Sequence, residues 1–331
     1  MTDTPVSTLS GPLRIGISRC LLGDEVRWDG GHKRDGFLVG TIGRHVEWVP
    51  VCPEVESGLP VPRETLRLMR SPYGGVPVNG IPVRLVFRSG GDWTDEMAGW
   101  AATRVRELER ERLDGYILKK DSPSCGMTRV KIHGESGPGA RVGRGLFAEA
   151  LMTHFPNLPV EEEGRLNDPR LRENFIERVF AYHRLKALFE GRWTVGDLVR
   201  FHTAHKLTLL AHRPEAYRAL GRLVAEAKAL PRAEVKATYM HDFMAAMAVV
   251  ATPARHANVL QHMLGHLRGR IDASARDEIL GLIDEHRRGI VPLIVPLTLL
   301  RHYVRRAAVE YLEGQTYLEP HPRELALRNH V

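Results

Sequence analysis

The feature that most constrains this fold is a short apolar segment running into a cysteine-bearing loop, because the pattern occurs three times. A short apolar run bounded by turn residues is typical of a buried strand. The segments are residues 14–18, 48–51 and 116–118. They lead into Cys20, Cys52 and Cys125, which are all the cysteines of the chain. Ligands bind at the carboxyl edge of open parallel sheets, so three strands sharing such a sheet would place all three thiols along that edge.

The loop after the third segment is predicted to be stiff. Pro123 fixes its own φ and pushes Ser122 into an extended conformation, and Gly126 allows a turn where a Cβ would clash. The loop should therefore display the hydroxyls of Ser122 and Ser124, and the thiol of Cys125, at the end of a strand.

Two further polar loops follow the other cysteines. In the glycine-rich loop after the first, Arg27, Asp29 and Lys33 can supply charge or hydrogen bonds to a ligand. In the proline-rich segment after Cys52, Glu54 lies two residues beyond the thiol and Arg63 adds a cation. Such loops are often only turns with solvated charges, so their interpretation depends on the thiols.

Strand-like and helix-like segments alternate over the first half of the chain. Residues 83–87 and 160–163 have the character of strands, whereas residues 95–113 and 144–154 have that of helices. This βαβ alternation predicts an α/β domain over residues 13–164, with a doubly wound, Rossmann-like, mostly parallel sheet.

The apolar pattern then becomes helical and predicts a separate all-α domain over residues 165–331. Asp168, followed by proline, is typical of a helix start, and Thr194 with Asp197 resembles a capping box. The expected helices cover residues 170–189, 194–211, 214–229, 236–267, 273–288 and 296–313.

The positive charge is concentrated in this second half. The net charge is +7, but residues 1–164 carry 21 Lys and Arg against 22 Asp and Glu, whereas residues 165–331 carry 26 against 18. A basic domain of this kind indicates either a polyanion-binding module or an Arg-rich solvated helical surface. The candidate phosphate contacts are Arg268 and Arg270, Arg287 and Arg288, and Arg301, Arg305 and Arg306.

Membrane and export signals are not apparent in the sequence. No segment approaches the roughly 18 uninterrupted apolar residues of a membrane span. Residues 1–12, which we predict to be disordered, lack the pattern of an export signal. Three cysteines in a chain of this length do not make a disulfide framework. We therefore expect a cytoplasmic protein with no membrane partner.

Several chemistries could use the three thiols. Free cysteines are commonly buried as small hydrophobes. Structural zinc sites use close Cys-x₂₋₄-Cys pairs, which this sequence lacks. A cysteine nucleophile needs a neighbouring base and would leave two thiols idle. An iron–sulfur cluster would use all three and leave one iron without a protein ligand, able to bind sulfur as a Lewis acid.

Three ordered motifs resemble those of the thiouracil desulfurase family. They are Ser18–Gly23 with Arg27–Gly30, Cys52–Glu54 with Gly58–Glu64, and Ser122–Gly126. The resemblance covers residues 13 to about 160. The helical remainder is similar to the YbgA-type domain found fused to this family. The fusion resembles the bacterial desulfidase that converts 4-thiouridine in tRNA to uridine.

The resemblance implies specific roles for the residues named above. It implies a [4Fe–4S] cluster held by Cys20, Cys52 and Cys125 with one open iron, the catalytic carboxylate at Glu54, and the catalytic serine at Ser122. The expected substrate-binding residues are Arg27, Asp29, Arg63, Lys119 and Ser124.

The expected reaction is a non-redox desulfuration, in which water replaces the sulfur of a thiolated pyrimidine and sulfide is released. The substrate would be 4-thiouridine in tRNA, with the basic helical domain binding the tRNA backbone. Two alternatives stay open. The enzyme could act on free thiouracil-type bases, with the helical domain used to form a homodimer, or the protein could be an iron–sulfur redox sensor that binds nucleic acid.

Overall fold

The computed structural model describes residues 12–134 and 138–331 and divides the chain into two compact units, Gly11–Asn167 and Asp168–Val331. The predicted disordered segment, residues 1–12, lies outside the described residues except for Pro12. The two units are an α/β domain and a helical domain.

A parallel sheet forms the centre of the α/β domain. Its strand order is β2-β1-β6-β9, and every neighbouring pair is parallel. The strands are β1 Leu13–Ser18, β2 Val46–Val51, β6 Gly115–Leu118 and β9 Val160–Glu162. The mostly parallel α/β fold predicted from the apolar segments is confirmed, and the three strands that precede cysteines are neighbours in this sheet.

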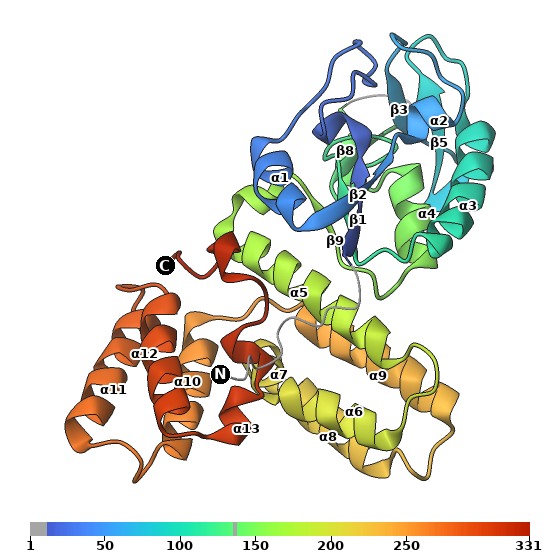
Figure 1. The fold of residues 1–331 in the computed structure, drawn as a ribbon. Helices are drawn as coiled ribbons and strands as arrows, with labels where there is room; N and C mark the ends of the chain where they lie inside the picture. The colour runs from blue at the N-terminus through green and yellow to red at the C-terminus, as the bar shows by residue number, and fades with distance from the viewer. Residues whose placement is uncertain (1–11, 135–137) are drawn as a thin grey trace. The chain divides into compact units, whose positions relative to one another are not determined.

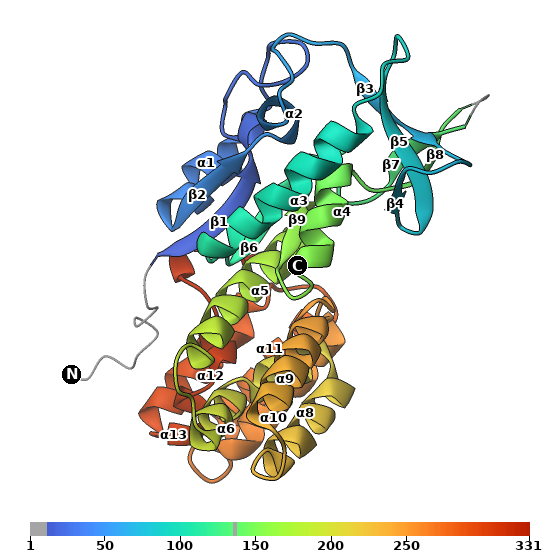
Figure 2. The same ribbon diagram turned by 90° about the vertical axis from the view of Figure 1, so that its right-hand side faces the viewer.

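Helices cover the parallel sheet on both sides. They are α1 Gly36–Gly40, α3 Thr94–Arg110 and α4 Leu146–His154. The short helix α2, Pro53–Glu56, directly follows Cys52 at the end of β2. Figure 2 shows α3 and α4 packed side by side, with α1 on the opposite side of the strands. Gly16 of β1 is needed for close packing, because a Cβ there would lie 2.2 Å from the buried ring of Tyr116 on β6.

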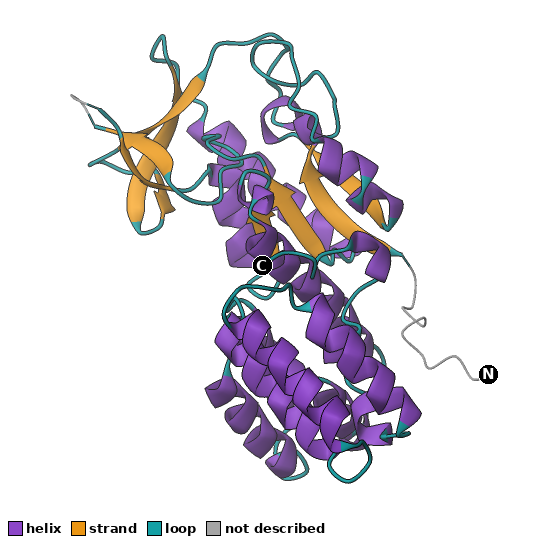
Figure 3. Ribbon diagram, turned by 90° about the vertical axis from the view of Figure 1, so that its left-hand side faces the viewer, coloured by secondary structure: helices purple, strands orange, loops and turns teal. Residues whose placement is uncertain are grey.

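A second sheet extends the α/β domain, and the sequence did not predict it. Its order is β4-β5-β3-β7-β8, with antiparallel pairs except for the parallel pair of β3 and β7. The strands are β3 Leu66–Arg70, β4 Val76–Val78, β5 Ile81–Phe87, β7 Val130–His133 and β8 Ala140–Gly143. Figure 3 shows them as a group separate from the parallel strands.

The strand predicted at residues 83–87 is real, but its assignment to the parallel sheet is wrong. It is part of β5 and pairs with β3 and β4. Val83 and Leu85 are buried whereas Arg84 between them is exposed. This alternation is typical of an antiparallel strand with one solvated face, rather than of a strand buried on both faces.

The second unit consists of helices packed around apolar cores. They are α5 Pro169–Leu188, α6 Val195–Ala204, α7 Lys206–His212, α8 Pro214–Glu226, α9 Arg232–Met247, α10 Pro253–His266, α11 Ala273–Arg287, α12 Ile294–Arg306 and α13 Glu310–Glu313. The predicted all-α character is confirmed. Within the described residues, no helix is both long enough and apolar enough to cross a membrane.

Local helix signals in this domain match the structure better than the predicted helix lengths. Asp168 accepts hydrogen bonds from two backbone N–H groups at the start of α5, and Thr194 forms the capping box with Asp197 at the start of α6. The helix predicted over residues 236–267 is two helices, because the chain breaks before Pro253. Proline cannot donate the backbone hydrogen bond of a continuing helix.

Candidate active site

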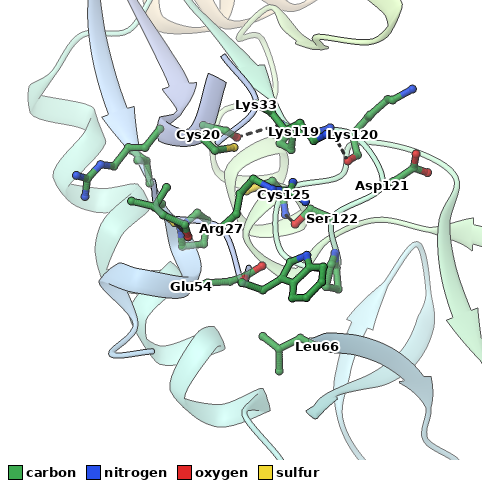
Figure 4. A pocket seen from close by; sticks show the side chains of 18 of the residues that line it. Cys20, Arg27, Lys33, Glu54, Leu66, Lys119, Lys120, Asp121, Ser122 and Cys125 are labelled. Carbon is green, nitrogen blue, oxygen red and sulfur yellow. Dashed lines mark hydrogen bonds between the residues drawn. The ribbon is translucent and has the colours of Figure 1, made fainter. Parts of the chain in front are cut away.

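A cavity of about 400 Å³ lies at the carboxyl ends of β1, β2 and β6, and all three cysteines line it. Cys20 lies in a short 3₁₀ turn directly after β1. Cys52 directly follows β2 and is the N-cap residue of α2. Cys125 lies in the loop after β6, and Figure 4 shows it facing the same space as Cys20, Glu54 and Ser122.

Hydrogen bonds to the Ser122 hydroxyl and close packing at two glycines hold the loop of Cys125 in place. The hydroxyl oxygen of Ser122 accepts hydrogen bonds from the backbone N–H groups of Ser124 (3.2 Å) and Cys125 (3.1 Å). A Cβ on Gly126 would lie 2.8 Å from the carbonyl oxygen of Ser122, and a Cβ on Gly145 would lie 2.3 Å from that of Ser124. Both positions therefore require glycine, as the sequence predicted for Gly126.

Two glutamates at the end of the parallel sheet support the same loop. Glu162 accepts hydrogen bonds from the backbone N–H groups of Met127 (2.7 Å) and Thr128 (3.3 Å). Glu163 accepts one from the backbone N–H of Lys120 (2.8 Å) and forms a short ion pair with the ammonium group of Lys119. These carboxylates fix the segment on both sides of Ser122.

Burial keeps the three thiols protonated in the absence of a metal. The pKa of Cys20 is raised to about 11, mainly by burial and also by the neighbouring Cys52, against the opposing charges of Lys119 and Arg27. Burial also raises the pKa of Cys52 and holds that of Cys125 well above its usual value. The thiolates repel one another, and a metal centre that binds all three would relieve both penalties.

The donor set fits an iron–sulfur cluster better than a single ion. In the part of the chain that the structure describes, no group of three or more His, Cys, Asp or Glu side chains converges closely enough to hold one metal ion. Cluster ligands each bind a different iron and therefore need not meet at one point. Three buried thiols around one cavity match the soft ligands that such clusters use.

Glu54 is a carboxylate that lines the cavity together with the three thiols. Its Oε2 atom accepts hydrogen bonds from Arg63 Nε (2.8 Å) and Nη2 (2.6 Å), whereas Oε1 accepts one from the hydroxyl of Ser124 (2.9 Å). Arg63 also donates to the carbonyl oxygens of Pro60 (3.2 Å) and Val26 (2.9 Å). Arg63 and Ser124 thus orient Glu54 from opposite sides.

The structure brings together most, but not all, of the residues predicted for the site. Arg27, Arg63 and Lys119 line the cavity with the cysteines, Glu54 and Ser122. Asp29 does not line it; its carboxylate lies 3.4 Å from Arg27 Nε and accepts a hydrogen bond from the backbone N–H of Gly31. Ser124 is fully buried and does not line the cavity, although its hydroxyl donates to Glu54.

Sequence reasoning missed several residues of the cavity. Ser18 accepts a hydrogen bond from the backbone N–H of Lys119 (3.0 Å). Its hydroxyl partly offsets the rise that burial causes in the pKa of Cys125. Trp28 also lines the cavity, with 45% of its surface exposed. The exposed Lys33, expected from the glycine-rich loop, lines the cavity as well. Ser18 was detectable as the last residue of a strand that leads into a cysteine.

The arginine groups proposed as phosphate contacts are largely engaged within the helical domain. Arg287 and Arg288 both pair with Asp284. Arg301 and Arg305 both pair with Glu319. Their charge is therefore partly neutralised by neighbouring carboxylates.

Comparisons with known proteins agree with this division. The family model described as 2-thiouracil desulfurase matches residues 15–163, and the one described as protein of unknown function DUF1722 matches residues 206–322. The chain is 35% identical to the uncharacterized protein YbgA of Escherichia coli K12, over 50% of this chain and 98% of YbgA. It is 31% identical to the uncharacterized protein YbbK of Bacillus subtilis 168, over 33% of this chain and 71% of YbbK.

Among solved structures, the [4Fe-4S]-dependent thiouracil desulfidase TudS is 29% identical, and the match covers 48% of this chain and 97% of that one with a TM-score of 0.39. The α/β domain, with its thiols and carboxylate at the carboxyl edge of a parallel sheet, defines a desulfurase-type protein with a helical domain attached. Residues 15–163 match the 2-thiouracil desulfurase family and are joined here to a YbgA-like DUF1722 domain, as the motifs predicted. The chain belongs to the family of YbgA, which it covers almost completely.

Proposed function

We propose that this protein removes the sulfur atom from a thiolated pyrimidine, and that its substrate is 4-thiouridine in tRNA. The observation that carries the proposal is the position of Cys20, Cys52, Cys125 and Glu54 around one cavity in a desulfurase-family domain. In the reaction, the C=S bond is replaced by C=O. Water supplies the oxygen, its two protons leave with the sulfur as hydrogen sulfide, and no electrons are transferred.

The three cysteines would hold a [4Fe–4S] cluster; the similar protein TudS is a [4Fe-4S]-dependent thiouracil desulfidase. When bound, the cluster supplies a Lewis-acidic iron with an open position and affinity for sulfur. The residues of this chain then have to bind the base, orient it and move protons.

Glu54 is the proposed general base. Its Oε2 atom already accepts two hydrogen bonds from Arg63, whereas Oε1 accepts only one within the described residues, from Ser124. A lone pair of Oε1 therefore remains to accept a proton from the attacking water. Arg63 and Ser124 act as positioning residues, because each holds one oxygen of the carboxylate.

Ser122 is placed to donate a hydrogen bond rather than to accept a proton. Its oxygen already accepts from the backbone N–H groups of Ser124 and Cys125. Its own O–H is then left for an acceptor atom in the cavity, such as the carbonyl oxygen of the pyrimidine or an atom of the base on which negative charge develops. Lys119 lines the same cavity and adds a positive charge, and Trp28 offers an aromatic face to the ring.

Two observations support tRNA rather than a free base. Arg27, Lys33, Lys119 and Lys120 line the cavity, and a nucleotide carries phosphates that a free base lacks. The residues from 165 onward carry 26 basic against 18 acidic side chains, which favours a polyanion. Free thiouracil is the second candidate substrate, because the matching family model is described by that base.

The test is anaerobic reconstitution of the full chain with iron and sulfide, followed by nucleoside analysis of treated tRNA. We expect 4-thiouridine to disappear while uridine and sulfide appear in equal amounts. Activity on free 2-thiouracil alone would restrict the function to the free base. A brown protein that desulfurates neither substrate would contradict the proposal and support the sensor.

A further inference from the structure

A groove of about 720 Å³ lies between α6 and α8 of the helical domain, and the proposed reaction does not use it. Figure 1 shows these two helices side by side. The volume is in the range of ligand-binding pockets, which is about 300–1,000 Å³. The groove belongs to the helical domain alone, since its lining residues lie between Val195 and Lys228.

The floor of the groove is apolar and is kept open by small residues. Tyr217, Gly221 and Ala225 are spaced four residues apart on α8 and line the groove together, as expected for one helix face. Val199 of α6, which is 44% exposed, lines the opposite side. The absence of a side chain on Gly221 leaves space beside His202, because a Cβ there would lie 3.7 Å from His202 Nε2.

The rim of the groove is basic. Lys206, Arg218, Arg222 and Lys228 line it, and none of its described lining residues is acidic. Over residues 12–134 and 138–331, none of these cations forms an ion pair, in contrast to Arg287, which pairs with Asp284. Unneutralised cations around an apolar floor are complementary to a polyanion that carries aromatic groups.

A buried polar atom faces this groove without a partner. His202 is 4% exposed and lines the groove; its Nδ1 lies 3.1 Å from the hydroxyl of Tyr239, whereas its Nε2 has no hydrogen-bond partner among the described residues. Burial lowers the pKa of His202 to about 4, so the ring is neutral at physiological pH. An unpaired buried nitrogen is costly, and a ligand in the groove can satisfy it.

We infer that this groove is a binding site for an RNA strand, with phosphates on the four cations and an unpaired base or ribose against Tyr217 and His202. A nucleobase supplies both a flat face for Tyr217 and polar edges for His202, and the ribose hydroxyl offers a further partner. The choice of RNA rests on the proposed function. The site is distinct from the arginine groups that the sequence suggested.

The first test measures the affinity of the full chain for tRNA that lacks thiouridine, at several salt concentrations. Arg218→Gln with Arg222→Gln should weaken binding about tenfold and make the dependence of log K on log salt less steep by about 1.5. The matched control is Arg287→Gln with Arg288→Gln, which removes the same charge from the C-terminal end of α11 and its C-cap. Because those arginines are paired with Asp284, the control should change affinity by no more than about twofold.

A second variant tests the groove without altering charge. Gly221→Leu would fill the space between α8 and His202, and leucine is a better helix former than glycine. We expect binding to weaken by about tenfold while the thermal unfolding temperature stays the same or rises. Equal tRNA binding by wild type, both groove variants and the control would overturn the inference. So would wild-type binding to vesicles of anionic phospholipid but not to tRNA.

The desulfuration assay separates this inference from the proposed function. Groove variants should keep wild-type turnover of free 2-thiouracil, if the enzyme accepts it, and show a raised KM for 4-thiouridine in tRNA. A wild-type protein that binds tRNA through the groove but removes no sulfur would contradict the proposed function and support the groove. If both groove variants desulfurate tRNA as well as the wild type does, the proposed function is supported and the groove is not the RNA-binding site.

Discussion

The two domains use polar side chains in different ways. In the α/β domain, Glu54 and Ser122 face a cavity and keep hydrogen-bonding capacity for a ligand. In the helical domain, two buried histidines outside the groove are bonded to the fold itself: His205 Nδ1 to the carbonyl of Phe201 (2.8 Å) and His256 Nδ1 to the hydroxyl of Tyr317 (2.8 Å). The type of a polar residue therefore does not by itself indicate function. A hydrogen-bonding group that faces a cavity and has no partner within the protein is the better indicator.

A buried charge network makes the contrast sharper. Arg328 Nε lies 3.1 Å from Glu173, and His212 Nε2 lies 3.3 Å from Glu177, with all four side chains at most 11% exposed. Burial would raise the pKa of Glu177, but the hydrogen bond and charge of His212 and the charge of Arg328 hold it well below its usual value. These groups stabilise the helical domain and keep each other charged.

The largest effect should come from the thiols. Cys125→Ser should abolish the visible absorption of the reconstituted protein and reduce desulfuration to the background rate, because a hydroxyl is a poor ligand for iron. The measurement is the iron content and absorbance after anaerobic reconstitution. Ser18→Ala, beside the same thiol, is the control and should keep its colour. Full iron loading of Cys125→Ser would show that this cysteine is not a ligand.

Removing the proposed base should separate chemistry from cluster binding. Glu54→Gln should lower turnover about 10²- to 10⁴-fold while the absorption of the cluster is retained. The control is Glu56→Gln on the same short helix, which pairs with Arg104 and does not line the cavity. If Glu54→Gln retains turnover, another group accepts the proton from water.

The helical domain should lose stability in acid. Burial lowers the pKa of His205 and of His256 to about 3, from 6.5 in an unfolded chain. The unfolded state therefore takes up protons below pH 6.5 that the folded state cannot. The contribution of these two histidines to the free energy of unfolding is complete above pH 6.5 and decreases as the pH falls. The loss is about 1.5 kcal/mol for each histidine at pH 5.5.

Glu177 and His212 also contribute to the pH profile. The depressed pKa of Glu177 adds stability that is likewise lost in acid, whereas the raised pKa of His212 adds stability that is lost as the pH rises through its folded value. Thermal unfolding at pH 7.5 and 5.5 measures the balance. Replacing the exposed His262 by Gln should leave the profile unchanged. A protein more stable at pH 5.5 than at 7.5 would contradict the structural role of the buried histidines.

The smallest effect should come from a helix cap. Thr194→Ala removes the side-chain half of the capping box of α6 and should lower the free energy of unfolding by about 1 kcal/mol. Denaturant unfolding measures the change. Thr194→Ser keeps the hydroxyl and should recover most of it. A loss in Thr194→Ser equal to that in Thr194→Ala would show that the hydroxyl is not what matters.

Sequence reasoning succeeded where the cause is local. Apolar runs that end in turn residues revealed β1, β2 and β6, and the caps at Asp168 and Thr194 were recognisable from a few residues. The fit of glycine at position 126 followed from the same kind of argument. Signals of this kind depend only on neighbours along the chain.

The remainder depends on contacts between distant segments. Ser124 meets Glu54 across 70 residues of sequence, and Glu162 reaches Met127 across 35. Neither contact can be recognised from the residues that surround it in the sequence. The second sheet likewise joins β3 to β7, which lie on either side of α3 and β6.

The last strand of the α/β domain has a practical consequence. Glu162 and Glu163 hold the backbone on either side of Ser122, and they stand at the very point where the chain departs from its sheet. A protein shortened to its first domain would need every residue through Glu163 to keep the cysteine loop in shape. Removing Glu162 and Glu163 as well would reduce catalysis, because the loop would lose its support, although neither residue contacts the substrate.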